Sequence, residues 1–202
     1  LTSLPESFGR LTGLTELNLG KNELISLPES LGQLAGLKTL LLDFNRLSDL
    51  PEWFGQLTGL EIVYLSGNLL TSLPESFGRL TGLTELYLSK NKLTSLPEWF
   101  GHLTGLRELH LDYNMLSDLP ESFGQLTSLQ GLDLNKNNLT SLPKSFVRLA
   151  GLERLIIGRN DLANLPTAIV EFLTHIRATE YDSYPSDSDG SYPSDSDDEH
   201  QW

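Results

Sequence analysis

The sequence contains no cysteine, one methionine and four histidines, which are His102, His110, His175 and His200. Without cysteine there is no disulfide framework and no thiol nucleophile, and the histidines have no spacing from which a zinc site can be assembled. No apolar run approaches the roughly 18 residues that cross a bilayer, so we expect no membrane insertion. These absences favour a soluble chain that folds by apolar packing alone.

Basic residues are also scarce. The chain has 14 Lys and Arg against 27 Asp and Glu, a formal net charge of -13. Neutralising phosphates requires a basic stripe, so this balance argues against nucleic-acid binding. Seven carboxylates lie in residues 181–202, which contain no Lys or Arg, so residues 1–180 hold 14 basic and 20 acidic residues. The body of the protein is therefore only mildly acidic.

Leucine is in excess, with 46 of the 202 residues, and it recurs at a fixed period. Prolines fall at 5, 28, 51, 74, 97, 120, 143 and 166, and asparagines at 22, 45, 68, 91, 114, 137 and 160, always 23 residues apart. One unit reads Leu80-x-x-Leu83-x-x-Leu86-x-Leu88-x-x-Asn91-x-Leu93-x-x-Leu96-Pro97-x-x-Phe100. A period of this length is typical of stacked tandem repeats.

The first half of the unit predicts a short strand and a buried turn. Leu86 and Leu88 alternate around an outward Tyr87, which is the pattern of a strand with one buried face. In a stack, each strand pairs with its neighbours about 4.8 Å away. Asn91 can offer its amide to unpaired backbone groups in the turn. Losing one rung of this asparagine ladder is expected to cost roughly 1–3 kcal/mol.

The second half of the unit predicts a short helical turn. Pro97 suits its first position, and Glu98 lies at the positive end of the same turn. Gly101 supplies a conformationally permissive exit. Trp53 and Trp99 replace serine in this segment. They form either a second contact patch or rings packed on the adjacent turn, and we favour packing.

These units have the leucine-rich-repeat pattern. Their length and their Leu-Pro-x-x-Phe/Leu-Gly-x-Leu segment resemble the intracellular Ras-group repeats of Ras-suppressor and SHOC-2-type scaffolds. The resemblance implies an α/β solenoid, a horseshoe with a parallel β-sheet on the concave face and short helical or irregular turns on the convex face. It also implies a cytoplasmic scaffold whose concave face binds small GTPases, phosphatase subunits or similar regulators.

The pattern divides the chain into four parts. We predict a partial repeat with a truncated start at 1–10, seven 23-residue repeats at 11–171, the C-terminal part of a capping helix at 172–180, and a disordered acidic Ser/Asp-rich tail at 181–202. The capping helix is expected over 167–178, where apolar residues recur at helical spacing. Because residue 1 lies inside a repeat, we expect a longer natural protein.

The tail contains possible phosphorylation sites. Ser186, Ser194 and Ser196 each have an acidic residue three positions on, and they resemble acceptor sites of acidophilic kinases. Each phosphate would add a charge of roughly -1.5 to -2.

A second period of 69 residues, which is three repeats, distinguishes one face of the array. Residues 11–79 and 80–148 differ at 24 of 69 positions. The outward positions in and just after the predicted strands account for 14 of these differences in 18 positions, against 10 in 51 elsewhere. We favour retuning of a concave binding surface. The alternative is drift at positions where the turn geometry makes no demand.

The same outward positions carry side chains suited to a protein interface. The central strand column reads Asn18, Leu41, Tyr64, Tyr87, His110, Asp133 and Ile156. Aromatic residues with mixed charges around them are typical of protein interfaces. We predict a partner-binding site of Leu41, Phe44, Tyr64, Tyr87, Arg107, His110, Asp112 and Tyr113. In the competing interpretation, the rings lie flat on one another and only shield the sheet.

Catalytic motifs are missing. The sequence has no Gly-x-Ser-x-Gly elbow, no phosphate-binding Gly-Lys-Ser/Thr loop and no dinucleotide fingerprint. Asp43 and Asp112 share a column three repeats apart, about 14 Å at the usual strand spacing, which is too far for paired acid and base catalysis. We predict a monomeric protein that is not an enzyme and needs no cofactor and no metal.

Three functions agree with these observations. The first is an adaptor that binds a protein in its concavity. The second is a ligand-sensing domain of a larger immune-receptor or kinase chain, and the third is a structural array without a dedicated ligand. The adaptor is the function that we favour.

Overall fold

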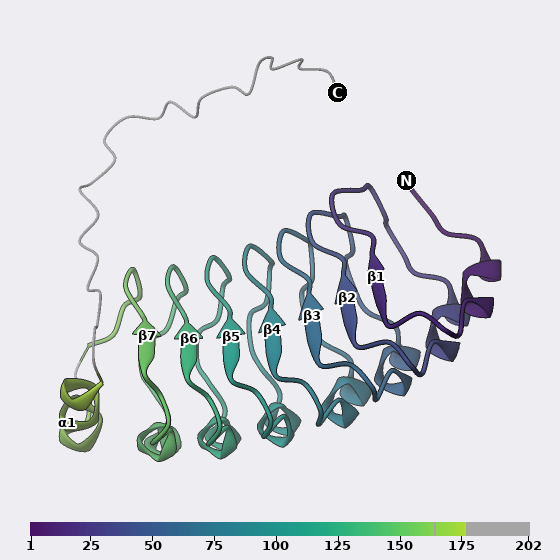
Figure 1. Ribbon diagram of the computed structural model, residues 1–202. Helices are drawn as coiled ribbons and strands as arrows, with labels where there is room; N and C mark the ends of the chain where they lie inside the picture. The colour runs from purple at the N-terminus through teal and green to yellow at the C-terminus, as the bar shows by residue number, and fades with distance from the viewer. Residues whose placement is uncertain (164, 177–202) are drawn as a thin grey trace, which may run out of the picture.

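The computed structural model describes residues 1–163 and 165–176. Seven strands of three residues each form one parallel sheet, in which the order along the chain is also the order in space (Figure 1). The strands are β1 (Glu16–Asn18), β2 (Thr39–Leu41), β3 (Ile62–Tyr64), β4 (Glu85–Tyr87), β5 (Glu108–His110), β6 (Gly131–Asp133) and β7 (Arg154–Ile156). Each repeat therefore forms one turn of a coil, and the predicted solenoid is confirmed.

The wall opposite the sheet consists of short 3₁₀ helices along the outer edge of the arc (Figure 1). They are η1 (Glu6–Arg10), η2 (Glu29–Gln33), η3 (Glu52–Gln56), η4 (Glu75–Arg79), η5 (Glu98–His102), η6 (Glu121–Gln125) and η7 (Lys144–Arg148). Each begins directly after a proline with extended backbone, as at Pro97 with φ -74° and ψ 161°. The proline ring restricts φ and so sets the direction in which the chain enters the turn.

The core lies between the two walls. Leu83, Leu86 and Leu88 have no exposed surface. The phenylalanine of each convex turn is also fully buried from Phe54 onward. The rings of Phe54 and Phe77 stack, and so do those of Phe100, Phe123 and Phe146, with centroids 6.2 Å apart for Phe100 and Phe123. Because each repeat buries its apolar side chains against the next, stability comes from contacts between neighbours.

Asparagine side chains connect consecutive repeats behind the strands. The Asn91 Nδ2 donates to the carbonyl oxygens of Leu65 and Leu88, each at 3.0 Å, and its Oδ1 accepts from the Leu70 N–H at 3.0 Å. The same three bonds recur at Asn45, Asn68, Asn114, Asn137 and Asn160. The predicted ladder is present, and it links each repeat to the preceding one.

The glycine of each convex turn allows close approach of the next turn. A Cβ added at Gly55 would lie 2.2 Å from the carbonyl oxygen of Ser76, and one at Gly101 would lie 2.4 Å from that of Ser122. Gly67 is the glycine with positive φ among the described residues. The expectation that Gly101 serves as a permissive exit is therefore wrong, because its role is to leave space.

Two tryptophans change this contact. A Cβ added at Gly32 or Gly78 would face side-chain atoms of the next turn, which include the ring of Trp53 at 3.4 Å and that of Trp99 at 3.1 Å. The indole rings thus pack on the preceding turn and hold the two backbones further apart, as the packing interpretation predicts. We call the contacts between η2 and η3 and between η4 and η5 the tryptophan joints.

The helix α1 (Thr167–His175) lies beyond η7 at the end of the coil (Figure 1). Ile169 is buried, and the ring of Phe172 meets that of Phe146 edge-on at 6.0 Å. The helix ends at His175 rather than at 178, because Ile176 has extended backbone. The rest of the segment at 172–180 and the tail, including the possible phosphorylation sites Ser186, Ser194 and Ser196, fall outside the described residues. Among the helices that are described, none combines the length and the hydropathy that crossing a membrane requires.

Candidate functional site

The outward face of the sheet carries a stack of rings. Tyr64, Tyr87 and His110 occupy the third position of β3, β4 and β5 and are paired in register. The ring centroids of the two tyrosines lie 4.4 Å apart with an interplanar angle of 2°, and those of Tyr87 and His110 lie 4.8 Å apart at 23°. We call these three residues the aromatic stack. The rings lie flat on one another, as the competing interpretation predicts. All three side chains are only half-buried, so part of each remains exposed on the outward face.

Polar groups hold the stack in place. The Tyr87 hydroxyl donates to Glu85 Oε2 at 2.8 Å. Burial of the ring and the neighbouring Glu85 carboxylate raise the pKa of Tyr87. On the other side, His110 Nε2 lies 3.9 Å from Glu108 Oε2. Glu108 in turn pairs with Arg154, at 2.7 Å, two repeats further on.

Gly131 makes this last ion pair possible. It occupies the position between Glu108 and Arg154 in the column, and a Cβ added there would lie 2.0 Å from the Glu108 carboxylate. The absence of a side chain thus lets Glu108 and Arg154 meet across β6.

Two further aromatic rings lie at the rim of the sheet. Phe44 and Tyr113 are 50% and 42% exposed, and both have left-handed backbone, with φ 53° and 54°. The equivalent Gly67 has φ 69°, and Lys21, Lys90, Lys136 and Arg159 share the conformation. This backbone costs a residue with a Cβ roughly 1–2 kcal/mol. The hypothesis of drift without geometric demand is therefore wrong for this column.

Charged groups surround Tyr113. Lys136 Nζ lies 4.0 Å from the ring centroid and donates to the Tyr113 hydroxyl at 2.7 Å, while Lys90 Nζ lies 5.7 Å from the same centroid. An ammonium group from each neighbouring repeat thus lies within cation–π distance of the ring.

The structure brings some predicted residues together and separates others. Leu41 pairs in register with Tyr64 and extends the line of the aromatic stack. Asp112 lies beside His110, whereas Arg107 is exposed and directly precedes β5. The rim rings of Phe44 and Tyr113 are three repeats apart, so they form two separate contact points.

Sequence spacing missed one member of the site. Asp133 is paired in register with His110, and together with Asp112 these residues offer three metal-ligating atoms within 4.8 Å of one another. The exclusion of a metal site by spacing along the chain therefore does not hold. The signal was available in the 23-residue offset, which places His110 and Asp133 on neighbouring strands.

Comparisons with known proteins agree with this architecture. A leucine-rich repeat model matches residues 2–47, 36–93 and 58–116, and a leucine-rich repeat region model matches residues 100–188. The chain belongs to the leucine-rich repeat family. The solved structure of a leucine-rich repeat protein from Leptospira interrogans is 33% identical with a TM-score of 0.63, and the match covers 85% of this chain and 56% of that chain. The chain therefore spans about half the length of that relative. No curated protein matches it.

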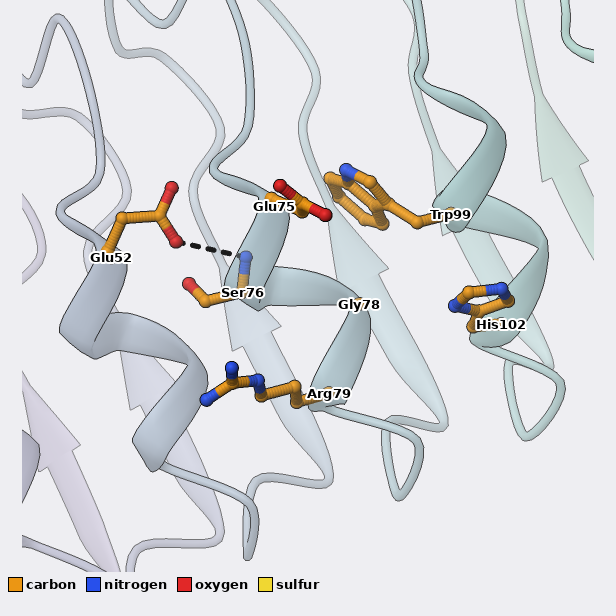
Figure 2. A pocket seen from close by; sticks show the side chains of 7 residues that line it. All are labelled: Glu52, Glu75, Ser76, Gly78, Arg79, Trp99 and His102. Atoms are coloured by element: carbon orange, nitrogen blue, oxygen red, sulfur yellow. Dashed lines mark hydrogen bonds between the residues drawn. The ribbon is translucent and has the colours of Figure 1, made fainter.

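A hollow of about 390 Å³ lies on the opposite wall of this leucine-rich repeat protein (Figure 2). It is lined by Glu52, Glu75, Ser76, Gly78, Arg79, Trp99 and His102. Figure 2 shows the Trp99 ring between η4 and η5, at one of the tryptophan joints. The mixed charges of this hollow offer no convergent set of groups for chemistry.

Glutamates connect the convex turns where serine is present. Glu121 accepts the Lys144 N–H at 3.1 Å and the Ser145 N–H at 3.2 Å. Glu6, Glu52 and Glu98 make the corresponding bond to the serine of the next turn. Among the hydrogen bonds of residues 1–163, neither Glu29 nor Glu75 has this bond, because a tryptophan follows in the next turn. These glutamates therefore cap the following turn, not their own as the sequence suggested.

This capping predicts a defined pH dependence. The backbone N–H groups of Lys144 and Ser145 lower the pKa of Glu121 below its ordinary value of 4.5. A lowered pKa in the folded state stabilises the protein above the unfolded-state pKa, and the contribution is lost as pH falls through the folded-state value. We expect Glu121→Gln to be less stable than wild type at pH 7, with a difference in free energy of unfolding that narrows as the pH falls below about 4.5.

Urea denaturation at several pH values measures this difference. Glu75→Gln is the matched control, because it changes the same position in a turn whose successor carries Trp99. A gap between wild type and Glu121→Gln that stays constant with pH would show that the carboxylate does not cap the next turn.

Proposed function

We propose that this leucine-rich repeat protein is a non-catalytic scaffold or adaptor that binds a protein partner on the concave face of its sheet. Repeats of this family generally mediate protein–protein interaction. The observation that carries the proposal is the pair of rim rings. Phe44 and Tyr113 remain half-exposed at backbone positions that Gly67 occupies with less strain. Bulky side chains in strained and exposed positions indicate a role outside the chain's own packing.

The aromatic stack supports the same proposal. Tyrosine provides a large contact area with few rotatable bonds, and aromatic residues dominate the energetics of protein interfaces. Because its rings already support one another, the stack is ordered before a partner arrives. Less conformational entropy is then lost on binding.

The charges on this face fit a protein better than a polyanion. Lys38 pairs with Glu61 at 2.7 Å, and Arg154 pairs with Glu108 at the same distance. Basic and acidic groups thus alternate and partly neutralise one another. Such a pattern selects a partner with matching charges and affects the association rate more than the affinity.

Within this proposal, the partner is a small GTPase or a phosphatase regulator in the cytoplasm. The 23-residue unit and its Leu-Pro-x-x-Phe/Leu-Gly-x-Leu segment support this class through their resemblance to Ras-group scaffolds. The similar protein from Leptospira interrogans contributes the fold to this argument and no partner.

We expect Tyr64→Ala with Tyr87→Ala to weaken binding to the partner by about 30-fold or more, because each interface anchor contributes on the order of 2 kcal/mol. Purified small GTPases, loaded with GDP or a GTP analogue, and a phosphatase catalytic subunit are the immobilised probes for biolayer interferometry. Ile25→Ala is the control, because it removes a side chain that is 64% exposed and lies outside the strands. Circular dichroism checks that each variant is folded.

Two results would count against the proposal at different levels. If no protein of the panel binds, the partner class is wrong. A photo-crosslinking residue at position 64, compared with one at position 25, then tests the concave face itself in cell extract. Equal crosslinking patterns at the two positions would contradict concave binding of any protein.

A further inference from the structure

The outward wall of β5 and β6 brings three metal-ligating side chains together. His110 ends β5, Asp133 ends β6, and the two residues are paired in register. Asp112 follows His110 by two residues. One ligand atom of each side chain lies within 4.8 Å of those of the other two, and all three residues are half-buried.

Neighbouring groups orient each of these side chains. The Ser89 hydroxyl donates to Asp112 Oδ1, and the Asn135 N–H donates to Asp133 Oδ1 at 2.9 Å. Stacking on Tyr87 fixes the plane of the His110 ring. Each carboxylate is thus held through one oxygen while the second is available, which is how outer hydrogen bonds commonly orient metal ligands.

The electrostatics of this cluster favour a cation. Arg154 forms its ion pair with Glu108 rather than with Asp133. Two carboxylates therefore converge without a salt bridge of their own to a basic side chain in residues 1–163. A bound cation would remove their mutual repulsion.

We propose that His110, Asp112 and Asp133 bind a divalent transition-metal ion. One imidazole with two carboxylates suits Zn²⁺ or Mn²⁺, whereas Ca²⁺ and Mg²⁺ prefer sites made of oxygen alone. Metal–ligand bonds of about 2.0–2.2 Å require the ligand atoms to move closer by about 1 Å, which side-chain rotation provides. Three protein ligands leave a coordination position for water or for a group from another molecule. The site does not depend on the proposed adaptor function.

Isothermal titration of the full chain with ZnCl₂ tests this site. We expect one equivalent of Zn²⁺ to bind, and we expect Asp133→Asn to weaken it by at least about tenfold. Asp43→Asn is the matched control, since Asp43 has the position of Asp112 three repeats earlier and lies outside the cluster. Its affinity should stay within about twofold of wild type. Melting curves without metal verify that both variants fold.

Side-chain NMR of the histidines locates the ion independently of any variant. In wild type, Zn²⁺ should shift the ring signals of His110, assigned with His110→Ala. If instead the ring of His102, His175 or His200 shifts while His110 stays still, zinc binds elsewhere and the proposal is wrong. Equal affinity in Asp133→Asn and wild type, or no binding at all, would also overturn it.

Discussion

Replacing Asn91 with alanine is expected to lower the free energy of unfolding by about 3 kcal/mol. The substitution removes three hydrogen bonds of 3.0 Å to the buried backbone of Leu65, Leu70 and Leu88. Each buried polar group left without a partner costs about 1–3 kcal/mol. Because these bonds join two repeats, the loss weakens the contact on which a stacked array depends.

Asn22→Ala provides the control at the start of the ladder. Asn22 is half-buried, and its Nδ2 donates to the carbonyl oxygens of Leu19 and Gly20 in its own repeat. Its Oδ1 accepts from the exposed amino terminus of Leu1 at 2.9 Å, in place of the buried backbone N–H that Asn91 binds. Its loss is expected to cost less than about 1 kcal/mol. Urea denaturation followed by circular dichroism measures both variants. Equal destabilisation by the two substitutions would show that links between repeats contribute nothing beyond the turn itself.

The second large effect is expected for Gly55→Ala, which should destabilise the protein by about 3 kcal/mol. The added methyl group would lie 2.2 Å from the carbonyl oxygen of Ser76, a contact that only movement of one turn can relieve. Such movement also lengthens the hydrogen bond from the Ser76 N–H to Glu52, now 3.1 Å.

Two other glycines test whether the loss of stability depends on the space around the added methyl group. At Gly78 the added methyl group would meet the Trp99 ring at 3.1 Å, and a side chain can shift more easily than backbone. At Gly13 nothing lies within 4 Å, so Gly13→Ala should be neutral or stabilising by up to about 1 kcal/mol. Chemical denaturation of the three variants tests the order. If Gly13→Ala is as destabilising as Gly55→Ala, close approach does not explain the convex glycines.

The fold could be predicted from the sequence because every repeat has the same structural requirements and meets them with the same residue types. Asn91 recurs at a position where a buried turn needs donors and acceptors, so its role follows from chemistry without coordinates. The end of α1 was harder to place. The apolar spacing continues to Ile176, whereas the backbone is already extended there.

Side-chain contacts between repeats other than the asparagine ladder could not be predicted from the sequence in the same way. Glu98 was assigned to the positive end of its own turn, but its carboxylate accepts the Ser122 N–H of the next turn at 3.2 Å. The cluster of His110 with Asp133 was missed for the same reason. Spacing along the chain does not measure distance across a stack, unless positions are compared one period apart.

The tryptophan joints have a mechanical consequence for the opposite wall, which carries Phe44 and Tyr113 at its rim. Elsewhere in the first six turns, a glutamate and a tight glycine contact fasten each turn to the next, as between Glu52, Gly55 and Ser76. At the joints an indole ring replaces both fastenings. We therefore expect bending of the coil to concentrate at these two joints. The joint between η4 and η5 lies between the repeats of Phe44 and Tyr113. A small rotation at this joint would therefore change the distance between these two rings.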